Sequence, residues 1–386
     1  MVSDYQEPLQ NGLNLPQEII DLFIISLQSL PEREARRALA ACTLVSQSVG
    51  VPARKLLHST IVLSASRGPL LRVPQRDLRY AFGQQILALE DLINRNSSFA
   101  SLIRKIQVEG GSSRLNILSE TNNVAKVFDS LRLHAKNLDS ISIAAKSGSP
   151  FALSNAGERF LKSYVGLITA VKLRHLQFTH IMDLPSQFVC NCSSLISLEL
   201  NSTWMTNEKG LGIPLPDSAS SLIQLVELTH VPNILNFHTN RSNINLSQLQ
   251  RFKTSISIPT EADIAWESMW EARLSIKSLE ILLHTRKNNI FDNSSLDIGK
   301  LPKLHNLRLS IQTGTHRTFP PLEDVLSILD PPTHPTSLHS IEVLFEYSTT
   351  APDALRIPPN SDADKAWSLL EISNLRLKHI HLKRVS

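Results

Sequence analysis

From about residue 100 onward, apolar and polar positions repeat one short phrase, in which apolar residues occupy the first, fourth and sixth positions. The phrase occurs at 103–108, 138–143, 173–178, 195–200, 223–228, 249–254, 276–281, 304–309, 338–343 and 377–382. The alternation at its end is typical of a short β-strand, whose successive side chains point to opposite faces. The middle units begin 22 to 28 residues apart, and this period predicts a solenoid of stacked strands.

Segments with helical spacing lie between these phrases, at 84–94, 123–135, 157–168 and 262–274. Strands that alternate with helices favour parallel pairing and right-handed crossovers. We therefore predict an α/β fold in which parallel strands line the inside of the array and helices cover the outside. The alternative interpretation is an ordinary parallel α/β sheet with scattered apolar phrases.

The N-terminal part of the chain has a different pattern, which predicts three short helices. The first helix is expected to begin near Leu15, with Asn14 as its cap and Pro16 in its first turn. Its apolar band is wider than one core-facing stripe, so both faces are expected to be in use. Gly50 and Pro52 predict a break before the last apolar residues. The chain then divides into a flexible tail (1–13), a helical module (14–63), a linker (64–83) and an array of about ten units (84–386).

Composition narrows the class of protein. Of the 386 residues, 42% are hydrophobic and 19% are charged, which is enough for a large folded core. The net charge of +4 arises from 39 basic and 35 acidic residues, so the chain as a whole has no strong field to hold nucleic acid or an anionic membrane. No signal peptide or membrane-spanning run is apparent. Three cysteines make no disulfide framework, so a cytoplasmic or nuclear location is expected.

Short catalytic motifs are absent from the sequence. There is no G-x-S-x-G elbow, no phosphate-binding G-x-x-x-x-G-K-[ST] loop and no H-E-x-x-H zinc motif. His379 and His381 alternate on one predicted strand, but no carboxylate or cysteine lies at local ligand spacing from them. Cys190 and Cys192 lack the second cysteine pair of a zinc site. We therefore expect a non-catalytic protein without a metal or cofactor.

The N-terminal module resembles the F-box. The resemblance rests on the LPQEII start (15–20), the L-x-x-C-x-L-V-S run (39–46) and the closing ARKLLHSTIVL (53–63). It implies docking on the Skp-type adaptor of a cullin-based ubiquitin ligase and, through the adaptor, on the cullin. The residues that would contact or shape this surface are Leu15, Pro16, Ile19, Ile20, Phe23, Leu39, Val45 and Ser46. The alternative is that the helices only cap the array, in which case their apolar faces would be buried.

The rest of the chain resembles the irregular leucine-rich repeats that accompany F-boxes in many fungal proteins. The repeated L-x-x-L-x-L phrase and the stretch ALEDLINRNSSFASLIRKIQV (88–108) carry this resemblance. The family's asparagine after each phrase is missing, and the first five units have Gly111, Lys146, Ile181, Thr203 and Val231 at that position. Other groups must therefore make the backbone hydrogen bonds at these turns.

Two polar positions in each phrase are predicted to face the concave side of the array and to contact a protein target. The candidates are His175, Gln177, Glu199, Glu227, Arg251, Lys253, Arg308, Glu342, His379 and His381. With the resemblance, this predicts a substrate-recognition subunit of a Skp–cullin–F-box ubiquitin ligase, whose target the sequence does not identify. The alternative is a protein-interaction scaffold with no ligase role. Exposed apolar side chains at Leu15, Ile19 and Phe23 would favour the ligase subunit.

Overall fold

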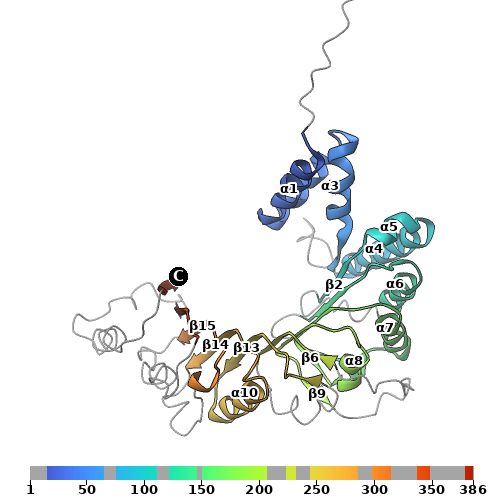
Figure 1. Cartoon of the computed structure of the whole chain (residues 1–386). Coiled ribbons are helices and arrows are strands. Elements are labelled where there is room, and N and C mark those ends of the chain that lie inside the picture. Colours follow the sequence, from blue (N-terminus) through green and yellow to red (C-terminus); the bar gives the residue numbers. More distant parts are fainter. Residues whose placement is uncertain are drawn as a thin grey trace, which may run out of the picture.

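The computed structural model describes residues 15–64, 75–110, 121–145, 150–206, 223–231, 244–285, 298–313, 337–347 and 379–385. These residues form an α/β fold with one large parallel sheet, helices beside the sheet and a group of helices at the N-terminal end (Figure 1). The prediction of an α/β fold with a parallel sheet is therefore confirmed. The predicted tail, 1–13, lies outside the described residues.

The large sheet contains eleven parallel strands, which follow one another in the order of the chain. They are β1 (Thr60–Ser64), β2 (Lys105–Glu109), β3 (Ser140–Ala144), β5 (His175–Thr179), β8 (Ser197–Asn201), β11 (Glu227–Val231), β13 (Arg251–Ile256), β14 (Ser278–Thr285), β15 (Asn306–Thr313), β16 (Ser340–Tyr347) and β17 (His379–Val385). Each of the ten predicted phrases contributes one of the strands from β2 to β17. Short parallel pairs lie beside the large sheet: β4 (Phe151–Ala152) with β6 (Ile181–Met182), β7 (Leu184–Pro185) with β9 (Met205–Thr206), and β10 (Ile223–Gln224) with β12 (Ile244–Asn245).

The first strand, β1, lies outside the ten predicted phrases. It is formed by the end of the segment assigned to the helical module, and it pairs with β2 from Thr60↔Lys105 to Ser64↔Glu109. Its β-branched residues, Thr60, Ile61 and Val62, favour an extended backbone. The segment 14–63 therefore contributes most of the first strand of the large sheet.

The helices that accompany the sheet lie on one of its two faces (Figure 1). They are α4 (Gln75–Arg95), α5 (Ser97–Leu102), α6 (Thr121–His134), α7 (Glu158–Ala170), α8 (Ser186–Cys190) and α10 (Pro259–Glu271), with the 3₁₀ turns η3 (Leu153–Asn155) and η4 (Ile298–Lys300). All four predicted helical segments are helices. Helix α4 begins earlier than predicted, at Gln75, so the expected linker at 64–83 overlaps its first turns.

Alternate strand residues form the core between the sheet and the helices. In β2 and β8 the second and fourth residues are buried, whereas the first, third and fifth are partly exposed. Tyr164 of α7 is fully buried at the centre of an aromatic cluster. Its ring centroid lies 5.1 Å from that of Phe188, 6.0 Å from that of Phe128 and 6.3 Å from that of Phe178. These contacts connect α6, α7, α8 and β5 into one core.

Thr203 makes the hydrogen bonds at one of the turns that lack an asparagine. Its buried hydroxyl donates to the carbonyl oxygen of Asn201 (3.1 Å) and accepts from the N–H of Ile181 (3.4 Å). His180, which precedes Ile181, and Ser202, which precedes Thr203, have positive φ angles of 55° and 47°. The expectation that another group replaces the asparagine is confirmed at this turn.

Cys192 makes the stability of the core dependent on pH. Its buried thiol donates to the carbonyl oxygen of Phe188 (3.6 Å). Burial, with a smaller contribution from Cys190, raises the pKa of this thiol to about 12. A thiol in an unfolded chain has a pKa of about 8.5, so above that pH the unfolded chain releases a proton that the folded chain keeps. The free energy of unfolding is therefore expected to fall as the pH rises from about 8.5 towards 12.

Denaturant midpoints at about pH 7.5 and about pH 9.5 measure this effect. The Cys192 thiol is expected to lower the free energy of unfolding by up to about 1.4 kcal/mol over this interval. The Cys192→Ala variant should therefore lose less stability than wild type. Val189→Ala truncates a buried neighbour without removing an ionisable group, so it should be less stable but keep the wild-type pH dependence. An equal pH dependence in the Cys192 variant and the wild type would contradict the assignment.

Before β1, the described part of the helical module contains α1 (Gln17–Ser26), the 3₁₀ turn η1 (Leu27–Ser29), α2 (Glu32–Cys42) and α3 (Gln47–Ser59). The prediction of three helices is confirmed. Helix α1 begins at Gln17 because Pro16 occupies the cap position, and the predicted cap, Asn14, lies outside the described residues. The small core of the module consists of Ile24, Leu39 and Ala53, against which partly buried residues of the same helices pack.

The predicted break at Gly50 and Pro52 is wrong, because α3 continues through both residues. Pro52 has no N–H, so the carbonyl oxygen of Ser48, four residues earlier, loses its helical partner. The side-chain amide of Gln17 donates to this oxygen instead (3.1 Å) and joins α1 to α3. A proline is therefore tolerated inside the helix because another helix supplies the missing donor.

Gly50 allows α2 and α3 to approach closely. A Cβ at this position would lie 2.9 Å from the carbonyl oxygen of Thr43, which is a backbone atom at the end of α2. No side chain fits there unless the two helices separate.

The module is joined to the sheet without a loop, since α3 ends at Ser59 and β1 begins at Thr60. The carbonyl oxygen of Ser59 accepts from the N–H of Arg104 (2.8 Å), and the ring of His58 meets the ring of Phe99 edge-on at 5.4 Å. Burial, together with two neighbouring arginines, lowers the pKa of His58 and so favours the neutral imidazole. Hydrogen bonding and aromatic contact therefore both hold this junction.

Candidate docking surfaces

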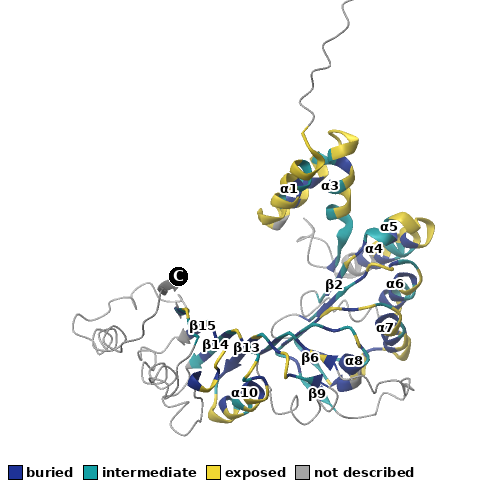
Figure 2. Cartoon of the chain, in the orientation of Figure 1, coloured by how far each residue is buried: buried dark blue, intermediate teal, exposed yellow. Residues whose placement is uncertain are grey.

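Exposed apolar side chains gather on the helical module. Among the described residues, fourteen large apolar side chains are exposed, and nine of them belong to the module (Figure 2). These nine residues, here called the module surface, are Leu15, Ile19, Leu22, Phe23, Ile25, Leu30, Leu44, Val45 and Val51. Exposed apolar side chains in such numbers mark interaction sites on folded proteins. The module surface is therefore a candidate docking surface.

Helix α1 has apolar side chains on both of its faces. Ile24 is completely buried in the core of the module, whereas Ile19, Leu22 and Phe23 are 49%, 63% and 56% exposed. Residues three and four apart lie on the same side of a helix, so these three side chains form one outward stripe. One face of α1 therefore packs in the core of the module, and the other apolar face is open to solvent.

The residues that the F-box resemblance implies occupy different places in the module. Leu15, Pro16, Ile19, Phe23, Val45 and Ser46 are exposed, Ile20 is partly buried and Leu39 is buried. Leu39 belongs to the core of the module, and the Ser46 hydroxyl caps α3 by accepting from the N–H of Val49 (3.3 Å). The resemblance did not assign Leu22 to the docking surface. Its position three residues after Ile19 places it on the same side of the helix, and this spacing could have predicted that it belongs there.

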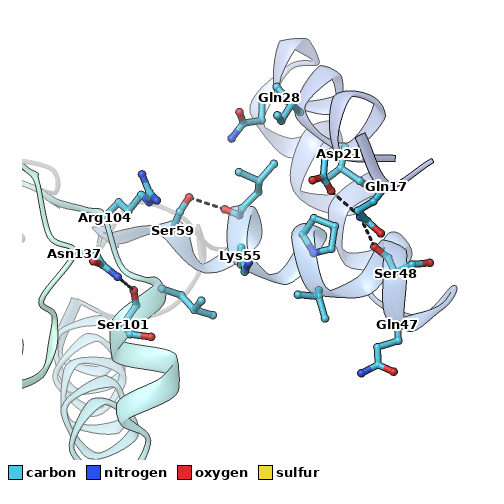
Figure 3. A pocket seen from close by; sticks show the side chains of 16 residues that line it. Gln17, Asp21, Gln28, Gln47, Ser48, Lys55, Ser59, Ser101, Arg104 and Asn137 are labelled. Carbon is cyan, nitrogen blue, oxygen red and sulfur yellow. Dashed lines mark hydrogen bonds between the residues drawn. The ribbon is translucent and has the colours of Figure 1, made fainter. Parts of the chain in front are cut away.

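A cleft of about 1260 Å³ lies between the module and the beginning of the sheet (Figure 3). Helices α1 and α3 form one wall, and the residues that precede β2 and β3 form the other. The lining consists of Gln17, Asp21, Ile24, Ile25, Gln28, Gln47, Ser48, Val51, Pro52, Lys55, Leu56, Ser59, Ser101, Leu102, Arg104 and Asn137. This described lining mixes apolar groups with one carboxylate and two cations, so it favours no single class of small ligand.

The predicted target-contacting residues from His175 to Glu342 lie on the face of the large sheet opposite the accompanying helices, here called the open face. None of those with described side chains is buried: His175, Arg251 and Arg308 are exposed, whereas Gln177, Glu199, Glu227, Lys253 and Glu342 are partly exposed. The backbones of His379 and His381 pair with Ser340 and Glu342, and their side chains lie outside the described residues. The strand register thus aligns all ten predicted residues in two neighbouring rows.

Opposite charges pair across neighbouring strands of the open face. Glu227 pairs with Arg251, Lys253 Nζ lies 2.8 Å from Glu280 Oε1, and Arg308 Nε lies 3.4 Å from Glu342 Oε2. Sequence reasoning missed Glu280, which completes a row of alternating sign. Solvent-exposed pairs of this kind add little stability. Their effect here is to make this part of the open face nearly neutral.

Within the described ranges, no group of three or more histidine, cysteine, aspartate or glutamate side chains is placed to hold a metal ion. No helix in the described part of the chain has the length and apolar character needed to cross a bilayer.

A scan against protein-family models finds no match to this sequence, and a search of curated proteins finds none either.

Proposed function

We propose that this chain is the substrate-recognition subunit of a Skp–cullin–F-box ubiquitin ligase. In this proposal residues 14–63 are an F-box that docks on the Skp-type adaptor, and residues 84–386 are an irregular leucine-rich-repeat solenoid that binds a protein target. The observation that carries the proposal is the module surface, which leaves Leu15, Ile19 and Phe23 in contact with solvent.

The energetics of the module surface support docking. Removing apolar area from water contributes about 25 cal/mol per Å², so covering these aliphatic and aromatic side chains would contribute favourably to the binding of a partner. A module that only capped the sheet would bury its apolar faces, whereas Leu44 is 87% exposed and Val45 is 70% exposed. The exposed faces therefore favour a separate partner over the cap.

The open face of the sheet supports the second half of the proposal. Its two rows of polar side chains form a broad surface, on which several weak contacts can set specificity. The chain itself would carry out no chemistry. It would hold the target near a ubiquitin donor elsewhere in the complex, so that their encounter becomes effectively unimolecular. Such a subunit would act in the cytoplasm or the nucleus.

Co-purification of the full chain with a Skp-type adaptor tests this proposal. We expect the wild-type chain to retain the adaptor and a Leu15→Ala, Ile19→Ala, Phe23→Ala variant to lose it, because truncating interface anchors often costs about 2 kcal/mol or more each. All three side chains are exposed, so the variant should fold normally. The matched control is Leu92→Ala with Leu133→Ala, which truncates exposed leucines of α4 and α6 and should leave retention unchanged.

Failure of the folded wild-type chain to retain the adaptor would overturn the proposal. The chain would then be studied as a protein-interaction scaffold with no ligase role. Equal loss of the adaptor in the triple variant and the control would show that retention does not depend on the module surface.

A further inference from the structure

A ladder of backbone hydrogen bonds brings the residues that precede successive strands into contact along one edge of the large sheet. The carbonyl oxygen of Lys277 accepts from the N–H groups of His305 (2.8 Å) and Asn306 (3.0 Å). The carbonyl oxygen of His305 in turn accepts from the N–H groups of His339 (2.8 Å) and Ser340 (3.0 Å). Lys277, His305 and His339 are therefore neighbours, although they lie far apart in the sequence.

The charged side chains in the described segments that lead directly into β14, β15 and β16 are all basic. The described segments that lead into these strands, 272–277, 298–305 and 337–339, contain no aspartate or glutamate. Their basic residues, here called the basic edge, are Arg273, Lys277, Lys300, Lys303, His305 and His339. Since the chain has nearly equal numbers of acidic and basic residues, this local excess is a property of the edge and not of the overall composition.

Two described carboxylates that flank the segment before β14 have partners. Glu271, at the end of α10, accepts from the N–H of Leu246 (3.1 Å), and Glu280, in β14, pairs with Lys253 on the open face. Lys277 and Lys303 are exposed to solvent. Lys277 and Lys303 therefore offer positive charge to a partner outside the described chain.

Exposed apolar side chains lie beside these charges. Trp270 is 45% exposed and Leu274 is 60% exposed, at the end of α10 that leads into β14. The guanidinium of Arg273 lies over the Trp270 ring, 4.5 Å from its centroid, and donates to the Trp270 carbonyl oxygen (3.0 Å). An apolar anchor and a row of cations are thus placed side by side.

We infer that the basic edge, with Trp270 and Leu274, binds an acidic polypeptide segment that contains an apolar residue. Carboxylates complement the lysines and the histidines, and the apolar residue packs against Leu274 and the edge of the indole. Phosphate recognition favours bidentate arginine, but the one arginine here is engaged with Trp270. Stacking of nucleic acid bases requires an open aromatic face, and Arg273 covers one face of this indole.

The inference rests on the proposed function only in assigning the acidic segment to a degradation target. Peptide binding is measured without the adaptor, so the two proposals fail separately. Adaptor retention without peptide binding would overturn this inference alone, and peptide binding without adaptor retention would overturn the proposed function alone.

Fluorescence anisotropy with the full chain and a labelled synthetic peptide tests the inference. The peptide places aspartate and glutamate residues around a single leucine, and its neutral counterpart has asparagine and glutamine in their place. We expect the acidic peptide to bind and the Lys277→Glu, Lys303→Glu variant to bind it at least about ten-fold more weakly. Salt at about 0.5 M should weaken binding by wild type, because these charges are exposed. Leu274→Ala should weaken binding at any salt concentration.

The matched control is Lys136→Glu with Lys172→Glu. These exposed lysines precede β3 and β5 on the same edge of the sheet, far from α10, so their reversal should leave the affinity within about two-fold of wild type. The inference is overturned if the neutral peptide binds as tightly as the acidic one, or if the control loses as much affinity as the test variant. Equal or tighter binding of labelled oligothymidine would identify the edge as a nucleic acid site instead.

Discussion

Replacing Gly50 by valine is expected to unfold the helical module while the large sheet stays folded. The added Cβ would lie 2.9 Å from a backbone carbonyl oxygen of Thr43, which cannot move away as a flexible side chain can. Overpacking of this kind costs about 1 to 3 kcal/mol. The core of the module is small, with Ile24, Leu39 and Ala53 at its centre, so such a loss is a large fraction of its local stability. Amide hydrogen exchange should show loss of protection in α1 and α3 and unchanged protection in β13 to β15.

Gly83→Ala is the control for this substitution. Gly83 lies inside α4, and a Cβ there would be 3.7 Å from Asn123 Nδ2, an ordinary contact distance. Alanine is the better helix former by about 1 kcal/mol, so this variant should be as stable as wild type or more stable. Unchanged exchange in the Gly50 variant would contradict the close approach of α2 and α3.

Truncating Tyr164 to alanine is expected to cost about 3 to 5 kcal/mol, the range for loss of a buried aromatic side chain. The ring is fully buried and contacts Phe128, Phe160, Phe178 and Phe188, which come from three helices and one strand. Its removal would leave a cavity where these elements meet. Denaturant unfolding monitored by far-ultraviolet circular dichroism measures the loss.

Tyr164→Phe separates the ring from its hydroxyl. Among the described residues this buried hydroxyl has no hydrogen-bond partner. Removing it should be neutral or stabilising by up to about 1 kcal/mol, because an unpaired buried polar group is a cost in the folded state. Burial also raises the pKa of Tyr164. Above pH 10 this tyrosine ionises in the unfolded wild-type chain before it does in the folded chain, so the wild type loses stability there and the phenylalanine variant does not. A loss as large as that of the alanine variant would show that the hydroxyl has a partner.

The strands could be predicted from the sequence because each one repeats the same local pattern. Even the weakest phrase, at 249–254, forms β13, since Phe252 is buried as the pattern requires. The beginning of α4 and the strand at Thr60–Ser64 could not be predicted in the same way, because neither belongs to the repeat. The strand at Thr60–Ser64 also pairs with β2, a segment more than 40 residues later in the chain, and local spacing does not encode such pairing.

The candidate site was predictable in part. The apolar stripe at Ile19 and Phe23 follows from helical spacing, but whether a stripe faces a core or solvent depends on the neighbouring elements. The continuity of α3 through Pro52 depends on the Gln17 amide of another helix, which a proline rule does not take into account. Cross-strand pairs such as Lys253 with Glu280 depend on the register between units of unequal length, so Glu280 was missed.

Because α3 continues directly into β1 at Ser59 and Thr60, a change in the angle at this junction moves the far strands of the sheet more than the near ones. The eleven strands are separated by ten steps, and at about 4.8 Å for each step a path across them measures at most about 48 Å. A tilt of about 10° at the junction would move the last strand by up to about 8 Å, a displacement larger than the spacing between strands. Small changes in the contact between His58 and Phe99 would therefore move the far strands relative to the module. The alignment of a partner bound to the module with a partner bound to the far strands thus depends on the stiffness of this junction.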